Sequence, residues 1–190
     1  DHFRIGPRAM EDLDVSLKTG FLDVPLEGTQ DDSTRAAKAL RDLDVACIIT
    51  LGGDGTNRAV AKTCGDIPLL PISTGTNNVF PFMVESTMAG MAAGVIASNE
   101  TPLDQCTRKT PRLVISDHSG PRDIALVDAV VSKQGFIGSR ALWDVSLLDE
   151  IFLTRAEPGN IGFSSIGGHL CPLAPDSMKG VHIRIGPGGE

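Results

Sequence analysis

Continuous apolar runs and stretches with helical periodicity alternate along the first half of the chain. The apolar runs at 45–51 and 67–73 predict two buried strands, the first of them covered on both faces. Helical patterns at 29–44, from about 57 to 64, and at 83–97 predict helices before, between and after these strands. This order predicts an α/β fold, in which helices flank a parallel sheet in three layers.

Two of the expected helices carry further signals. Thr29 is placed to cap the first helix, and Ala36, Leu40 and Leu43 form its apolar face. The helix at 83–97 carries its larger apolar residues on one face, for which we expect core packing: Met88, Met91, Ala92, Val95 and Ile96. Short apolar segments at 3–6 and 21–24 are further strand candidates.

The pattern changes after about residue 108. Residues 112–117, a turn at 118–121 and residues 123–133 predict a β-hairpin. We expect a short helix at 144–155, capped by Asp144. Strands punctuated by glycine are expected at 160–166 and 180–186. The sequence therefore predicts two domains, an α/β domain over 1–108 and a β-rich domain over 109–190. Because the chain stops at a turn-like GPGGE, we expect the second domain to be incomplete at its C-terminus.

The charge balance limits which partners the chain can have. Its 190 residues include 17 basic and 24 acidic side chains, for a net charge of −7. Because there is no basic block to neutralise a phosphate backbone, nucleic acid is not an expected partner. The longest apolar stretch is about half of the ~20 residues that a membrane span needs, so no span is expected. The four cysteines form no CxxC pair, which is typical of reduced thiols in a cytoplasmic protein.

A glycine loop follows the first predicted strand and contains a carboxylate. It reads Gly52-Gly53-Asp54-Gly55-Thr56 and opens directly into a predicted helix. Glycines let backbone N–H groups approach a phosphate closely, and a helix N-terminus attracts an anion. The chain contains neither GxxxxGK[ST] nor GxGxxG, so backbone amides and threonine hydroxyls would have to bind the phosphate.

A second small-residue loop follows the next strand. Its candidate contacts to the sugar, phosphate or base of a nucleotide are Thr74, Gly75, Thr76, Asn77 and Asn78. Ligands of parallel sheets bind beyond the carboxyl ends of the strands, and both loops lie at such ends. We therefore expect the two loops to face one site. The alternative is that both are ordinary polar turns that cap helices.

Asp54 has a chemical role if its partner is a hydroxyl group. A carboxylate beside a nucleotide's phosphates can take the proton of an attacking alcohol, or hold the Mg²⁺ that bridges the phosphates. Asp128 lies in an apolar segment and needs a partner, either a ligand hydroxyl or a structural hydrogen bond. Arg140, His169, Ser164 and Ser165 are further polar candidates that also have structural interpretations.

Four segments resemble a known superfamily. "GGDGT" at 52–56 and "PISTGTNNVFP" at 71–81 are similar to the NAD kinases and diacylglycerol-type lipid kinases. With "SRALWD" and "FLTRAEPGNIGFSSIGG", the chain is most similar to the bacterial ATP-NAD kinase-like, or acetoin catabolism protein X-like, branch. The resemblance implies an α/β nucleotide-binding domain, a β-rich second domain and an active site in the cleft between them. It also implies a homo-oligomer.

The resemblance implies a kinase in which Asp54 activates the acceptor. ATP or polyphosphate would donate a phosphoryl group with magnesium present, and NAD would be the leading acceptor. Val127 and Asp128 stand where NAD kinases carry an Asn-Glu pair, and Arg58 and Ala59 stand where lipid kinases carry one. Two alternatives stay open for these reasons: a lipid kinase, and a non-catalytic protein that senses nucleotides in a catabolic pathway.

Overall fold

The computed structural model describes residues 19–133 and 145–186. The strand candidate at 3–6, the cap residue Asp144 and Arg140 lie outside the described residues. Residues 21–24 contain no regular secondary structure, so the strand prediction there is wrong. Among the described residues, no helix combines the length and the apolar character that crossing a membrane would require.

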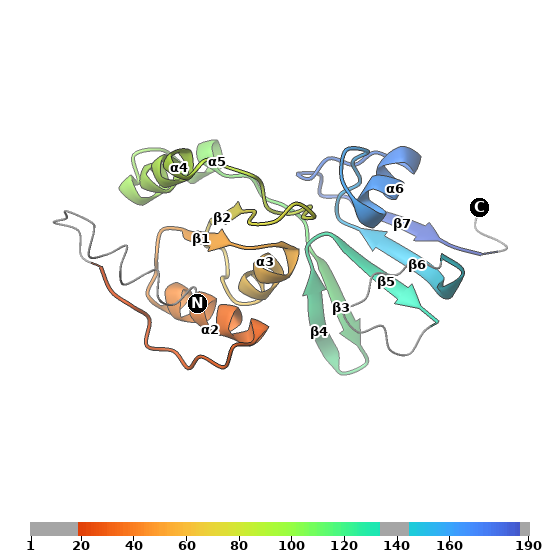
Figure 1. The fold of residues 1–190 in the computed structure, drawn as a ribbon, viewed down its shortest axis with the longest axis horizontal. Coiled ribbons are helices and arrows are strands. Elements are labelled where there is room, and N and C mark those ends of the chain that lie inside the picture. The colour runs from red at the N-terminus through yellow and green to blue at the C-terminus, as the bar shows by residue number, and fades with distance from the viewer. Residues whose placement is uncertain (1–18, 134–144, 187–190) are drawn as a thin grey trace.

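Two short parallel strands form the centre of the N-terminal part. β1 (Ile48–Leu51) pairs with β2 (Leu69–Ile72), and Ile48 lies opposite Leu69. In Figure 1, α2 (Gln30–Asp42) and α3 (Asp54–Ala61) lie on one side of this pair and α4 (Ser86–Ser98) on the other. The prediction of a parallel α/β unit with helices on both sides is confirmed, and within residues 19–133 its sheet has two strands.

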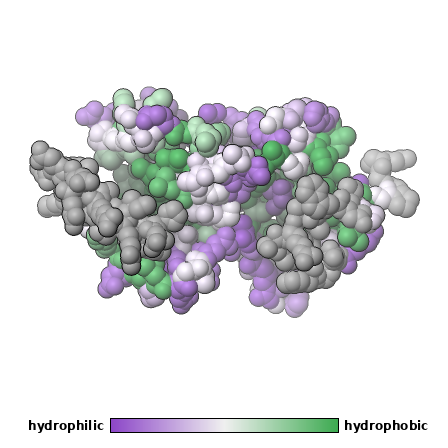
Figure 2. Space-filling model, viewed as in Figure 1, coloured by the Kyte–Doolittle hydropathy of each residue, from purple (hydrophilic) through white to green (hydrophobic). Residues whose placement is uncertain are grey.

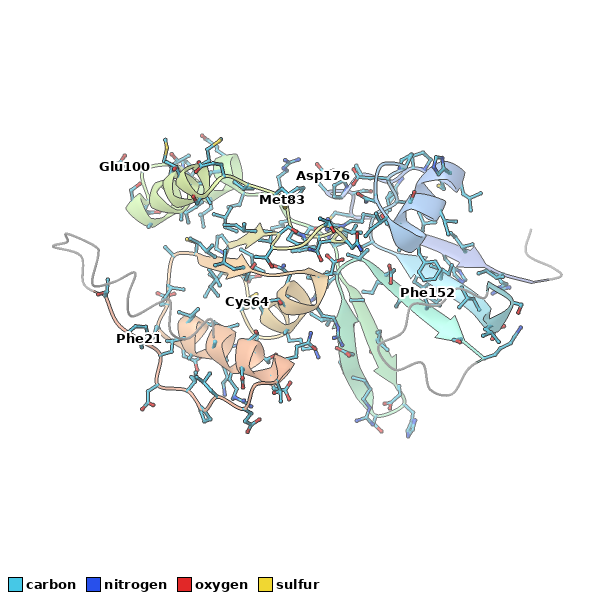
Figure 3. The ribbon with its side chains drawn as sticks, viewed as in Figure 1. Phe21, Cys64, Met83, Glu100, Phe152 and Asp176 are labelled. Atoms are coloured by element: carbon cyan, nitrogen blue, oxygen red, sulfur yellow. The ribbon has the colours of Figure 1, made fainter. Side chains whose placement is uncertain are left out.

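The core of this part lies between β1 and the helices α2 and α3. Ala37, Ile48, Val60 and Cys64 are buried together, and Cys64 is labelled in Figure 3. Thr29 is the N-cap residue of α2, as predicted. Of the predicted apolar face of α2, Leu40 packs against this core, but Leu43 is 66% exposed and the buried residue of the helix is Ala37.

The other face of β1 is largely uncovered in the described chain. Ile49 and Leu51 are 44% and 68% exposed, so the prediction of a strand covered on both faces is wrong. Helix α4 buries only Ala89, and its larger side chains are open to solvent: Met88, Met91 and Val95. Hydrophobic surface is visible in this half of the molecule in Figure 2. The expected core packing of Met88, Met91 and Val95 is therefore wrong, because helical periodicity indicates an apolar face but not whether anything packs against it.

In the described residues that follow, five antiparallel strands form two separate sheets. β3 (Leu113–Asp117) and β4 (Gly120–Ala125) form the predicted hairpin. The chain after Ala125 then leaves the hairpin, and the second sheet has the order β5-β6-β7: β5 (Asp128–Ser132), β6 (Leu148–Leu153) and β7 (Val181–Arg184). The short helices α5 (Leu103–Cys106) and η2 (Val145–Leu147) precede β3 and β6, and α6 (Gly162–Leu170) packs on β6 (Figure 1).

Two predictions for this part are wrong in type. Residues 148–153 form strand β6 rather than a helix, because Leu148, Ile151 and Leu153 are buried in the core shared with β5 and β7. Residues 162–170 form helix α6 rather than a strand. Contacts between distant segments decided both cases, and the local apolar pattern did not contain them.

A junction joins the N-terminal part to the antiparallel sheets. Ala61 and Phe80 are buried against Leu126 and Val127, which connect β4 to β5. The side chain of Arg58 in α3 forms an ion pair with Asp123 of β4. Its Nε also donates a hydrogen bond of 2.8 Å to the Ile124 carbonyl oxygen. The two halves of the chain are therefore held together by apolar packing and by charge.

Candidate functional site

The first glycine loop is shorter than predicted, because α3 begins at Asp54 instead of about residue 57. β1 ends at Leu51, and Gly53 is the N-cap residue, so Asp54, Gly55 and Thr56 form the first turn of the helix. The first N–H groups of a helix have no partner within it and carry partial positive charge. The amides of this turn therefore form an anion-attracting helix end.

Asp54 connects this helix end to the second loop. Its Oδ1 accepts the Phe80 amide at 2.7 Å, and the Val79 amide donates to both carboxylate oxygens at 3.1 Å. The two loops therefore meet, as the sequence predicted for strands of one parallel sheet. Asp54 is half-buried and lies between the loops, where its side chain fixes one against the other.

The glycines allow this close approach. A Cβ on Gly53 would lie 2.5 Å from Oδ1 of Asn78, and a Cβ on Gly52 would lie 2.5 Å from Oγ1 of Thr56. Gly52 is buried, so its missing side chain makes room for Thr56, whereas Gly55 is exposed. Gly53 and Asn78 are thus in contact across the two loops.

The remaining residues of the second loop face solvent. Thr74, Gly75, Thr76 and Asn77 are exposed. Asn78 is half-buried and donates from Nδ2 to the Ser73 hydroxyl at 2.8 Å, which in turn donates to the Gly75 carbonyl at 2.8 Å. Ser73 and Asn78 therefore shape the loop, and its threonines and Asn77 are accessible to a ligand.

A buried asparagine that the sequence analysis did not single out supports the first loop. The side chain of Asn57 has no exposed surface and donates from Nδ2 to the Gly53 carbonyl at 2.9 Å. Its Oδ1 accepts the hydroxyl of Thr50 in β1 at 2.6 Å. The detectable signal was a polar residue among the apolar positions of α3.

Asp128 lies on the other side of the junction, at the start of β5. It is half-buried, and its register partner in β6 is Leu153. Burial, followed by the negative charge of Asp54, raises the pKa of Asp128 above its usual value. The charge of Asp54 therefore acts on Asp128, although one residue begins helix α3 and the other begins strand β5.

Arg155 is a second residue that sequence reasoning missed. It follows β6 and is only 3% exposed, and its guanidinium lies 4.9 Å from the centroid of the Phe80 ring. Its Nη2 donates to the Thr110 hydroxyl at 3.0 Å, while its Nε is buried without a hydrogen-bond partner. Burial lowers the pKa of Arg155, and the charges of Glu157 and Asp54 act in the opposite direction.

The other polar candidates have structural roles or lie elsewhere. Ser164 is fully buried, donates to the Arg155 carbonyl at 3.1 Å and accepts the Asn160 amide at 2.9 Å. Ser165 donates to the Pro158 carbonyl, and His169 is exposed on α6. Within the described ranges, no three His, Cys, Asp or Glu side chains are grouped so as to hold a metal ion.

The comparisons with known proteins divide the chain into two matched regions. Residues 8–100 match the family model of the ATP-NAD kinase N-terminal domain, and residues 111–190 match that of the acetoin catabolism protein X C-terminal domain. The acetoin catabolism protein X of Cupriavidus necator is 45% identical over 174 residues.

That alignment covers 90% of this chain but 48% of the relative, so the chain spans about half the length of the protein it matches. No solved structure matches the chain significantly. The loops joined by Asp54 lie in the first matched region, and Asp128 and Arg155 lie in the second. The chain thus carries an ATP-NAD kinase-type N-terminal region followed by an acetoin catabolism protein X-type C-terminal region.

Proposed function

We propose that this protein is a phosphotransferase that moves the terminal phosphoryl group of ATP, or of polyphosphate, to a hydroxyl group. NAD is the leading acceptor. The observation that carries the proposal is the position of Asp54, whose carboxylate lies between the first turn of α3 and the Val79 and Phe80 amides. An acid held in this way lies beside the place where phosphates would bind.

The proposed chemistry divides between the backbone and the carboxylate. The amides of Asp54, Gly55 and Thr56 would bind the donor's phosphates at the helix end, and the exposed second loop would contact the nucleoside. Asp54 Oδ2 accepts one N–H bond, so it keeps a lone pair for the acceptor hydroxyl. The carboxylate takes the hydroxyl proton as the oxygen attacks the terminal phosphorus and the bond to the donor breaks.

Magnesium fits this arrangement as a partner of the nucleotide. Mg²⁺ at nucleotide sites takes most ligands from phosphates and water and needs only one or two carboxylates. Asp54 and Asp128 are the two acidic side chains that would supply them. When bound, the ion would draw negative charge from the phosphates.

Specific observations favour each of the two alternative functions. Phe82 and Met83 directly follow the second loop and are 59% and 77% exposed, as the acceptor surface of a lipid kinase would be (Figure 3). Val127 is buried in the junction and offers no side-chain hydrogen bond where NAD kinases carry a polar pair. That loss favours a nucleotide sensor without turnover.

Replacing Asp54 by asparagine tests the proposal. We expect Asp54→Asn to bind ATP but to lose kcat by about 10²–10⁴-fold, because the amide cannot accept the proton. Thr50→Val is the matched control: it removes the hydroxyl that supports Asn57, so it should lower Tm but leave most of the activity. The measurement is transfer of labelled phosphate to NAD together with nucleotide titrations.

The outcomes separate the alternatives. Full phosphoryl transfer by Asp54→Asn would contradict the role of this carboxylate. Label transfer from ATP to a lipid alcohol in vesicles, with none to NAD, would favour the lipid kinase. Tight binding of NAD or ATP by the unmodified protein, without turnover over a panel of acceptors, would favour the sensor.

A further inference from the structure

We propose that Arg155 binds an anionic group of the ligand, a phosphoryl or carboxylate oxygen, beside Asp54. The inference rests on the proposed function in placing the ligand next to Asp54, and it adds the side chain that recognises the ligand's negative charge. Because Arg155 follows β6, the recognition would come from the acetoin catabolism protein X-type region rather than from the glycine loops.

Arg155 is a buried cation whose hydrogen-bonding capacity is mostly unused. A guanidinium has five N–H donors, and burying it without an anionic partner is costly. Of the described side chains, only the neutral Thr110 hydroxyl accepts a hydrogen bond from it, and Nε has no partner. None of the ion pairs formed by the described residues includes Arg155.

A second arginine at the same junction shows what a structural role requires. Arg58 forms an ion pair with Asp123 and donates from Nε to the Ile124 carbonyl at 2.8 Å. Arg58 is therefore matched by protein groups, although it is more exposed than Arg155. The contrast indicates that Arg155 is kept for a partner that residues 19–133 and 145–186 do not supply.

Phe80 connects this arginine to Asp54. Its amide donates to the Asp54 carboxylate at 2.7 Å, and its ring centroid lies 4.9 Å from the Arg155 guanidinium. The charge of Glu157 acts on Arg155, and that of Asp54 does so to a smaller extent. The guanidinium thus lies near the proposed acceptor of the proton without forming a salt bridge to it.

The charge balance of the site also favours a cationic side chain that acts alongside magnesium. Asp54 and Asp128 are near enough to interact and would together repel a phosphate. The chain's net charge of −7 gives no general attraction for anions, so any attraction must be local. A planar guanidinium matches phosphate and carboxylate oxygens with paired N–H bonds, which a lysine cannot reproduce.

Calorimetric titration of the 190-residue chain tests the assignment. The probes are inorganic pyrophosphate, ATP and NAD, each at low and high salt. We expect Arg155→Gln to weaken pyrophosphate binding by about tenfold or more and to reduce its salt dependence, because one charge is lost. Arg155→Lys, which keeps the charge but not the paired geometry, should lie between Arg155→Gln and the unmodified protein.

Arg58→Gln is the control at the same junction. It should lower Tm by removing a matched ion pair, yet leave the affinity for pyrophosphate unchanged. If ATP binding falls in Arg155→Gln and NAD binding does not, the recognised charge is the donor's. The opposite pattern assigns it to the acceptor.

Three results would overturn the inference: unchanged pyrophosphate affinity in Arg155→Gln, an equal loss in Arg58→Gln, or no pyrophosphate binding by the unmodified protein. If Arg155→Gln does not fold, Arg155→Lys tests the inference by itself. An undiminished affinity of Arg155→Lys for pyrophosphate would contradict recognition by paired N–H bonds. Failure of the proposed function is distinguishable, because a protein that binds pyrophosphate through Arg155 but transfers no phosphoryl group retains this site. If Arg155→Gln turns over substrate with an unchanged KM, the anion-binding role of Arg155 is contradicted and the proposed kinase activity stands.

Discussion

Asp128 shows how one carboxyl group of the site affects another. Burial and the nearby charge of Asp54 raise the pKa of Asp128 in the folded protein. A carboxyl group whose pKa is higher in the folded state destabilises the fold at pH values above that pKa. The destabilisation is absent below the unfolded pKa of about 3.9, where both states are protonated.

We therefore expect Asp128→Asn to have a larger free energy of unfolding than the unmodified protein at pH 7. The gain should disappear near pH 3, and urea unfolding at both pH values measures it. Asp54→Asn removes the repelling charge, so in that variant the pKa of Asp128 should fall, as carboxyl NMR titration would show. An Asp128→Asn protein that is less stable at pH 7 would instead mean that the carboxylate has a structural partner.

Arg155 shows what a residue-level reading of the sequence could not reach, whereas Asn57 left a local signal as a polar residue among the apolar positions of α3. Asp54 and the two loops were predictable, because glycine-rich segments after parallel strands meet at one edge of the sheet. The unmatched state of Arg155 depends on Thr110 and Phe80, which are 45 and 75 residues away in the sequence. A local sequence pattern contains no information about contacts between residues so far apart.

At the scale of elements, α6 and α4 place glycine in helices for opposite reasons. A Cβ on Gly168 of α6 would lie 2.3 Å from the Glu157 backbone carbon, so the helix fits against the preceding loop only without a side chain. Gly90 and Gly94 in α4 have open space at the same position. Glycine there contributes only its conformational freedom, which weakens a helix.

We expect Gly168→Ala to lower the free energy of unfolding by about 1–3 kcal/mol, because backbone must move to admit the methyl group. Gly90→Ala in α4 should raise it by roughly 0.5–1 kcal/mol, since alanine is the better helix former and meets nothing. Chemical denaturation of the two variants measures both effects. Equal changes in the two helices would show that α6 does not pack as described.

The elements that the sequence could predict are those whose signals are local. The strands β1 and β2 and the hairpin were predictable, because apolar runs and turn residues are local signals. β6 and α6 were assigned the wrong type, since the pairing of β6 with two strands and the packing of α6 on it join distant segments. The apolar face of α4 was predicted, but its exposure depends on what surrounds the helix.

At the scale of the whole molecule, Asp123 ties the N-terminal part to the antiparallel sheets. It forms ion pairs with Arg58 and with Lys62, the latter at 3.0 Å. Burial acts to raise its pKa, but the Lys62 hydrogen bond, the Ile124 amide and the Arg58 and Lys62 charges together lower it below the usual value. Stability from a carboxylate with a lowered pKa is present above the unfolded pKa and is lost as the pH falls through the folded one.

We expect Asp123→Asn to be less stable than the unmodified protein at pH 7, and the difference to shrink as the pH falls below about 4. Other carboxylates titrate in both proteins, so the difference isolates Asp123. The midpoint of urea unfolding at pH 7, 4 and 2.5 is the measurement. A difference that stays constant with pH would show that the ion pairs contribute nothing to holding the two halves together.

The second loop takes part in both halves of the molecule. Asp54 binds the amides of Val79 and Phe80, and the Phe80 side chain packs with Leu126 and Val127. Backbone that is held at Val79 and Phe80 in this way has less conformational entropy to lose there when a ligand arrives. Less of the binding free energy is therefore spent on ordering this end of the loop, and more remains for affinity and for discrimination between ligands.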